Sequence, residues 1–156
     1  MRPRGRQAFG INCGSDLGLT SDDGISYSPD RLQLAGDTTA IDEFSRRHGH
    51  LYDPLLTSWA SGAQIVYDLS VSPGRSYLVT LTFYEPYRSR HAKSRVVDVH
   101  IGDVLVASGL VLPVGTTRLR LSYAVTAVPD YTLAVAVTRA GHLPARLAAL
   151  ELWNLS

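Results

Sequence analysis

The sequence has very little cysteine: its 156 residues include only Cys13. No internal disulfide can form, so burial of apolar side chains and hydrogen bonds must hold the fold together. A chain of this length buries roughly two-thirds of its unfolded surface, which is enough for one core. We therefore expect a single domain without covalent cross-links. A single cysteine is compatible with a reducing and with an oxidising compartment alike.

Long apolar runs are also missing, since no stretch approaches the ~18 apolar residues that span a bilayer. The first fourteen residues are partly basic and lack the apolar stretch of ~7 to 15 residues of a secretory signal. An apolar content of 45% and a charged content of 19% are typical of a globular protein. We expect no membrane partner, and a cytoplasmic location is favoured unless the chain is a fragment.

Net charge is nearly absent as well, at a formal value of +1. Such a chain has no global field of the kind that nucleic-acid-binding proteins use, so we expect no nucleic-acid partner. Positive charge is concentrated locally. Residues 1–7 form a basic N-terminal tail with Arg2, Arg4 and Arg6, and residues 8–156 form the domain.

No segment shows a sustained helical period, and short alternating runs take its place. Two of them lie between Ser76 and Asp103, where Tyr77, Val79, Leu81 and Phe83 share one side of the first run. The second run covers residues 95–101. Further runs at residues 8–13, 24–27, 32–34, 64–69, 104–107, 117–125, 131–138 and 146–153 bring the total to ten. This pattern predicts an all-β protein, an antiparallel β-sandwich of jelly-roll type, with helix confined to a turn or two within residues 38–58.

The loop between the two runs, residues 86–94, is the first place to look for function. Pro86 ends the preceding strand, and an exposed Tyr87 on a loop needs a reason, either ligand contact or local packing. Basic side chains follow it within eight residues, at Arg88, Arg90, His91, Lys93 and Arg95. They form either a solvated loop or a site for an anionic group.

An enzymatic reading has little support. Glu85 and Asp98 lie near the ends of two strands that are candidates for neighbours, a spacing of interest for a glycosidase. Strand-end acids facing Arg95 are more often salt-bridged, so we expect no catalysis. The histidines, at positions 48, 50, 91, 100 and 142, have neither cysteine companions nor helical spacing, and we expect no metal and no cofactor.

Seven pieces of sequence in order resemble the malectin and malectin-like domains. They are Ile11–Ser15, Asp23–Tyr27, Leu51–Tyr52 before the Tyr67–Leu69 strand end, Gly74–Val79, Leu81–Glu85, Arg95–Val99 and Pro144 before Ala149–Trp153. The resemblance covers residues 8 to 154 and implies a β-sandwich that binds carbohydrate without catalysis. In the animal lectin of this family, loop aromatics and one aspartate hold a glucose disaccharide.

Carried over by position, the resemblance implies five ligand-binding candidates. The aromatic pair after the central strand falls on Tyr87 and Arg88, so one ring is replaced by a guanidinium. Two further aromatic positions fall near Trp59 and Phe44, and the aspartate falls on His142. At Trp59 the alternative is a core position, because a large aromatic entering a strand is more often buried.

Two functions stay open at this point. The first is a lectin-like module for an oligosaccharide or glycan, acidic ones included. The second is a malectin-like interaction module that has lost sugar binding and serves as a structural subunit of an intracellular assembly. Its protein partner would contact the arginine tail at residues 2–6 or the basic loop at 86–95.

Overall fold

The computed structural model describes residues 6–15, 18–21, 24–30, 33–39, 59–85, 94–112 and 118–155, the segment 33–39 by its backbone alone. Among them it contains strands and turns and no helix, and thus none that is long and apolar enough to cross a membrane. The helical turn predicted within residues 38–58 falls almost entirely outside the described residues. The two residues of that range that are described, 38 and 39, belong to a strand.

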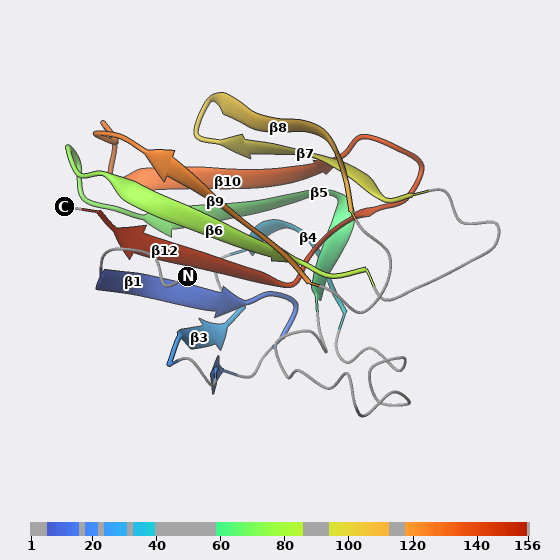
Figure 1. Cartoon of the computed structure of the whole chain (residues 1–156), viewed down its shortest axis with the longest axis horizontal. Helices are drawn as coiled ribbons and strands as arrows, with labels where there is room; N and C mark the ends of the chain where they lie inside the picture. The colour runs from blue at the N-terminus through green and yellow to red at the C-terminus, as the bar shows by residue number, and fades with distance from the viewer. Residues whose placement is uncertain are drawn as a thin grey trace.

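Two sheets packed face to face make up the molecule (Figure 1). The first has the order β2-β3-β1-β12-β6-β9, and the second has the order β11-β5-β10-β7-β8 with β4 paired to β5. All pairs are antiparallel except β1 with β3. The predicted all-β sandwich is confirmed. The strands are β1 (Arg6–Asn12), β2 (Leu19–Thr20), β3 (Ser26–Pro29), β4 (Gln33–Thr39), β5 (Trp59–Ser70), β6 (Tyr77–Phe83), β7 (Val96–Ile101), β8 (Val104–Val111), β9 (Leu119–Val125), β10 (Thr132–Arg139), β11 (Ala145–Leu147) and β12 (Ala149–Asn154).

The core lies between the sheets and follows from the period-2 alternation of the strands. In β10 the inward residues Leu133, Val135 and Val137 are buried, while the residues between them are exposed or half-buried. Strand β6 lies between β12 and β9 in the first sheet and is buried over nearly its whole length, with only Leu78 half-buried. The inward-facing residues of both sheets form one continuous apolar cluster.

The structure corrects one expectation about neighbours. Strands β6 and β7, which the sequence places next to each other around the 86–94 loop, belong to different sheets. Strand β6 pairs with β12 and β9, whereas β7 pairs with β10 and β8. Because hydrophobic alternation fixes which face of a strand is buried but not its partner, the sequence could not exclude this crossover.

Several strand boundaries also differ from the sequence prediction. Strand β1 begins at Arg6, inside the predicted basic tail, and pairs there with Asn154. Strand β5 begins at Trp59 rather than at residue 64, and Ala148 divides the last predicted strand into β11 and β12. The turn before β6 has the geometry that Pro73 and Gly74 favour, since Gly74 has a φ of 80° and the N–H of Arg75 donates to the carbonyl of Ser72 at 3.3 Å.

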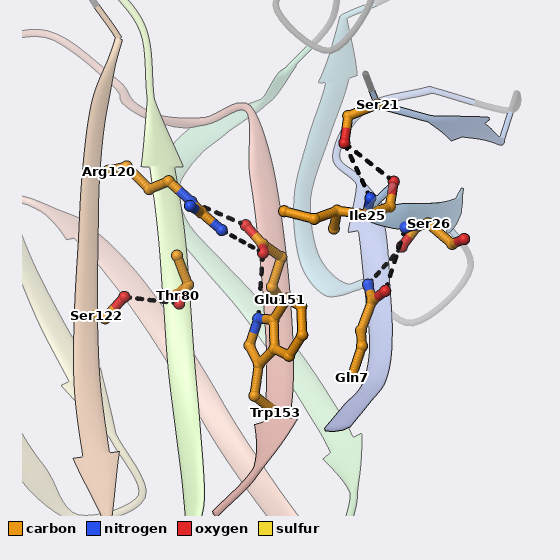
Figure 2. Close-up of polar contacts among 9 residues, drawn as sticks. All are labelled: Gln7, Ser21, Ile25, Ser26, Thr80, Arg120, Ser122, Glu151 and Trp153. Atoms are coloured by element: carbon orange, nitrogen blue, oxygen red, sulfur yellow. Dashed lines mark hydrogen bonds and ion pairs between the residues drawn. The ribbon is translucent and has the colours of Figure 1, made fainter. Parts of the chain in front are cut away.

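The outer face of the first sheet carries a polar network that ties three strands together (Figure 2). Glu151 of β12 is 0% exposed and accepts two hydrogen bonds from Arg120 of β9, at 2.6 and 3.2 Å. The indole N–H of Trp153 donates to the same carboxylate at 3.2 Å, and Thr80 of β6 bonds Ser122 at 2.7 Å. These contacts neutralise a buried carboxylate and thereby hold the β12-β6-β9 order.

Candidate functional site

Three connections between strands meet the sandwich at one end, at the right in Figure 1. Strand β5 begins there at Trp59, β6 is followed there by Glu85, and Arg95 precedes β7. The connection 140–144 between β10 and β11 lies at the same end, since the N–H of Ala140 donates to the carbonyl of Val96 at 2.9 Å. We call this region the loop end, defined by Trp59, Glu85, Arg95 and residues 140–146.

A buried ion pair forms the floor of the loop end. Arg95 Nε donates to Glu85 Oε2 at 2.5 Å, and the two side chains are only 5% and 4% exposed. A second donor of the same guanidinium, Nη1, bonds the carbonyl of Pro144. Of the two strand-end acids considered as partners of Arg95, Glu85 forms the ion pair, whereas Asp98 accepts from the N–H of Gly109. Arg95 joins three segments, because the end of β6, the start of β7 and the 140–144 connection all contact it.

A second arginine adds an aromatic contact to this floor. Arg146 of β11 lies 3.6 Å from Glu85 Oε1 through its Nη1, and its Cζ is 4.4 Å from the ring centre of Trp59. This is a cation–π geometry, which is strongest over tryptophan. Trp59 is 4% exposed, so the indole acts as a buried support beneath a guanidinium that is 18% exposed.

A separate, partly buried cluster fixes the loop after β1 against β5. Asp30 Oδ2 accepts from the N–H of Gly14 at 2.8 Å and from the hydroxyl of Tyr67 at 2.7 Å. Gly14 has a φ of 74°, and a Cβ there would lie 2.0 Å from the Trp59 carbonyl oxygen, so no larger residue fits. Cys13 and Tyr67 lie beside each other, and burial raises the pKa of both groups.

These raised pKa values predict a loss of stability in alkaline solution. Cys13 and Tyr67 have ordinary pKa values of 9.0 and 10.0, and both are higher in the folded state. The unfolded chain therefore loses these protons first, and the free energy of unfolding falls as pH rises above about 9. Urea denaturation between pH 7 and pH 11 tests this. The Cys13→Ala and Tyr67→Phe variants should show a shallower decline, whereas an unchanged slope in both would contradict the assignment.

The structure describes two of the five predicted site residues, Trp59 and His142. Tyr87, Arg88 and Phe44 lie outside the described residues, so their roles stay predictions. His142 is exposed on the 140–144 connection at the loop end. Trp59 is also at this end, but its ring is buried beneath Arg146, as expected of a core position.

Two features of the site were not anticipated from the sequence. Arg146 stands in a predicted strand, and only its alternation with the apolar Ala145 and Leu147 gives a signal of its special position. Asp98 does not lie beside Glu85, because β7 belongs to the other sheet. Its Oδ1 instead accepts from the N–H of Gly109 of β8 at 2.7 Å. Among the described residues, no three histidine, cysteine or carboxylate side chains are grouped closely enough to hold a metal ion.

Comparison with known proteins shows which solved structures share this fold. No family model matches the sequence, and no curated protein matches it. Solved structures do match. A β-glucuronidase of Bacteroides uniformis superposes with a TM-score of 0.72 at 18% identity, over 95% of this chain and 18% of its own.

Ectodomains of plant receptor-like kinases form a second group of structural neighbours. The Arabidopsis thaliana ANX2 ectodomain gives a TM-score of 0.74 at 13% identity, and the ANX1 ectodomain gives 0.71 at 15%. Both superpositions cover 96% of this chain. They span 50% of the ANX2 chain and 42% of the ANX1 chain. The domain is thus a β-sandwich with a malectin-like fold. The same architecture occurs as one part of larger proteins.

Proposed function

We propose that this domain is a non-catalytic carbohydrate-binding module whose site lies at the loop end. The observation that carries the proposal is the buried floor of Glu85, Arg95, Arg146 and Trp59. It fixes the bases of several loops from one ion-paired centre. A rigid base lowers the cost of ordering loop side chains around a ligand, which favours binding.

The chemistry of the predicted loop residues supports a sugar. An aromatic ring such as Tyr87 stacks on the C–H face of a pyranose, and His142 and Arg88 hydrogen-bond hydroxyl or carboxylate groups. The solved β-glucuronidase acts, by its name, on glucuronides, so a related fold already occurs in a carbohydrate-active protein.

Within this proposal, acidic oligosaccharides are the first ligands to test. Arg146, 18% exposed, places a guanidinium group at the floor, and the sequence supplies Arg88, Arg90 and Lys93 in the loop that follows Glu85. A guanidinium binds a carboxylate with two parallel hydrogen bonds, which a hydroxyl pair cannot match. Neutral glucose disaccharides serve as the comparison.

A glycan-array screen of the purified domain tests the function, followed by titration calorimetry on any ligand found. Truncating a central stacking residue typically costs more than 1 kcal/mol, so Tyr87→Ala should weaken binding by about tenfold. His142→Ala should weaken it less. The matched control is Tyr131→Ala, which removes an exposed tyrosine from the opposite end and should leave binding unchanged. Binding that survives Tyr87→Ala, or a folded domain that binds no glycan, would refute the proposal.

A protein-interaction module is the second candidate function, favoured by the edge strand β8. Its eight residues carry no charge and no proline, and Val104, Leu105 and Val111 are exposed. Uncharged edge strands are sites where other chains dock. Two register shifts against β7 bend this edge. If no glycan binds, partner searches should compare the wild type with Leu105→Lys, which places a charge on the edge.

A further inference from the structure

The opposite end of the sandwich, at the left in Figure 1, contains a cavity unrelated to the loop end. It has a volume of about 370 Å³ and lies between the β7–β8 turn, the β9–β10 connection and the last residues of β5. Asp68, which lines it, is nine residues along β5 from Trp59, or roughly 30 Å at the rise of an extended strand. The two regions can therefore be tested separately.

The cavity has an apolar floor and an acidic rim. The floor is formed by the buried Ile101, Val128 and Leu133, and the rest of the apolar lining comes from Val104, Val125, Pro129 and Ala134. Its charged lining consists of three carboxylates, from Asp68, Asp103 and Asp130, and the described lining includes no basic side chain. Asp103 and Asp130 are exposed, and Asp68 is half-buried.

The three carboxylates are not used within the fold. Within the part of the chain that the structure describes, none of them forms a hydrogen bond or an ion pair, unlike Asp30, Glu85, Asp98 and Glu151. They also do not form a group of three side chains that could hold a metal ion. Their arrangement thus suits a group larger than a metal ion that carries positive charge and several hydrogen-bond donors.

We propose that this cavity binds a basic side chain, an arginine or lysine presented by a partner peptide. The aliphatic stem lies against the apolar floor while the guanidinium or ammonium group reaches the carboxylates at the rim, a division such side chains routinely adopt. Val104, 62% exposed, lines the cavity, and Tyr131, 77% exposed, follows Asp130 directly in sequence. Both give apolar contact area to the residues that flank the basic side chain.

Backbone amide shifts in a 15N-labelled sample of the whole chain test this proposal. The probes are N-acetyl-arginine amide, N-acetyl-lysine amide and the peptide Gly-Arg-Gly, with N-acetyl-norleucine amide as the neutral analogue. The expected result is saturable shifts at the amides of Gly102, Asp103 and Thr132 with the cationic probes. The shifts should weaken at high salt, because screening acts on partly exposed charges.

Charge-neutral variants separate specific binding from a general attraction. Asp130→Asn and Asp103→Asn should each weaken binding about two- to fivefold, the range for one partly exposed ion pair, and together more. The matched control is Asp98→Asn, which changes the net charge equally but lies on β7 outside the cavity and keeps an acceptor for Gly109. Tighter binding of Gly-Arg-Gly than of N-acetyl-arginine amide would show that the residues beside the arginine add to the affinity, as expected of a peptide partner.

Three outcomes would overturn the proposal. They are no saturable shift at these amides in the folded protein, equal shifts with the norleucine probe, and equal weakening by Asp98→Asn. None of these results bears on the loop end, where glycans should shift amides near Arg95 and leave Gly102 unaffected.

Discussion

Replacing Glu85 by glutamine is expected to lower the free energy of unfolding by about 3–5 kcal/mol, the usual effect of removing one partner of a buried ion pair. Arg95, itself 5% exposed, would keep its charge next to a neutral amide, and Arg146 would lose the same carboxylate. For a domain of this size the midpoint of thermal unfolding should fall by about 6–20 °C. Urea denaturation and a thermal scan measure the two quantities.

Two further variants show whether the loss comes from uncompensated charge. Adding Arg95→Met to Glu85→Gln removes one stranded guanidinium and should recover part of the stability, although the bond to the Pro144 carbonyl is lost. Asp98→Asn, a carboxylate change on β7 of the other sheet, should stay within about 0.5 kcal/mol of the wild type. A loss below about 1 kcal/mol for Glu85→Gln would mean that water reaches the pair and that the floor is not buried.

Trp59→Ala is the second change with a large expected effect, about 3–5 kcal/mol of unfolding free energy. The substitution leaves a cavity at the start of β5 and removes the ring beneath Arg146. Trp59→Phe keeps a ring at this position and should cost less. Chemical denaturation followed by far-ultraviolet circular dichroism measures both without relying on tryptophan fluorescence.

The other tryptophan is the matched control for Trp59. Trp153 is only half-buried, and its indole N–H bonds Glu151 on the outer face of the first sheet. Trp153→Ala should therefore destabilise the domain less than Trp59→Ala. The reverse order would show that Trp59 is less embedded in the core than its 4% exposure indicates.

The consequences of Trp59→Phe for ligand binding are informative as well. If the loop end binds a glycan, a folded Trp59→Phe protein should bind more weakly, because Arg146 loses its best aromatic support and the loops lose part of their common base. Unchanged binding would mean that Arg146 takes no part in the site. Tyr87 would then be the residue on which the carbohydrate proposal depends.

The sequence by itself determined the fold class and the inward faces of the strands. Alternation in β10 and β7 predicts which residues are buried, because a strand places successive side chains on opposite faces whatever its partner. The turn at Gly74 could likewise be predicted, and the partner of Arg95 could be narrowed to Glu85 or Asp98, since all of these residues are close in sequence. The five ligand-binding candidates came from the family resemblance, and three of them lie outside the described residues.

Only the tertiary structure decided which distant segments meet. It separated β6 and β7 into two sheets, which removed Asp98 from the neighbourhood of Glu85 and brought Arg146 into it. It also gathered Asp68, Asp103 and Asp130, far apart in the chain, around one cavity. The physical reason is that strand partners are chosen by packing between whole sheets, and a local pattern of apolar residues is compatible with many such pairings.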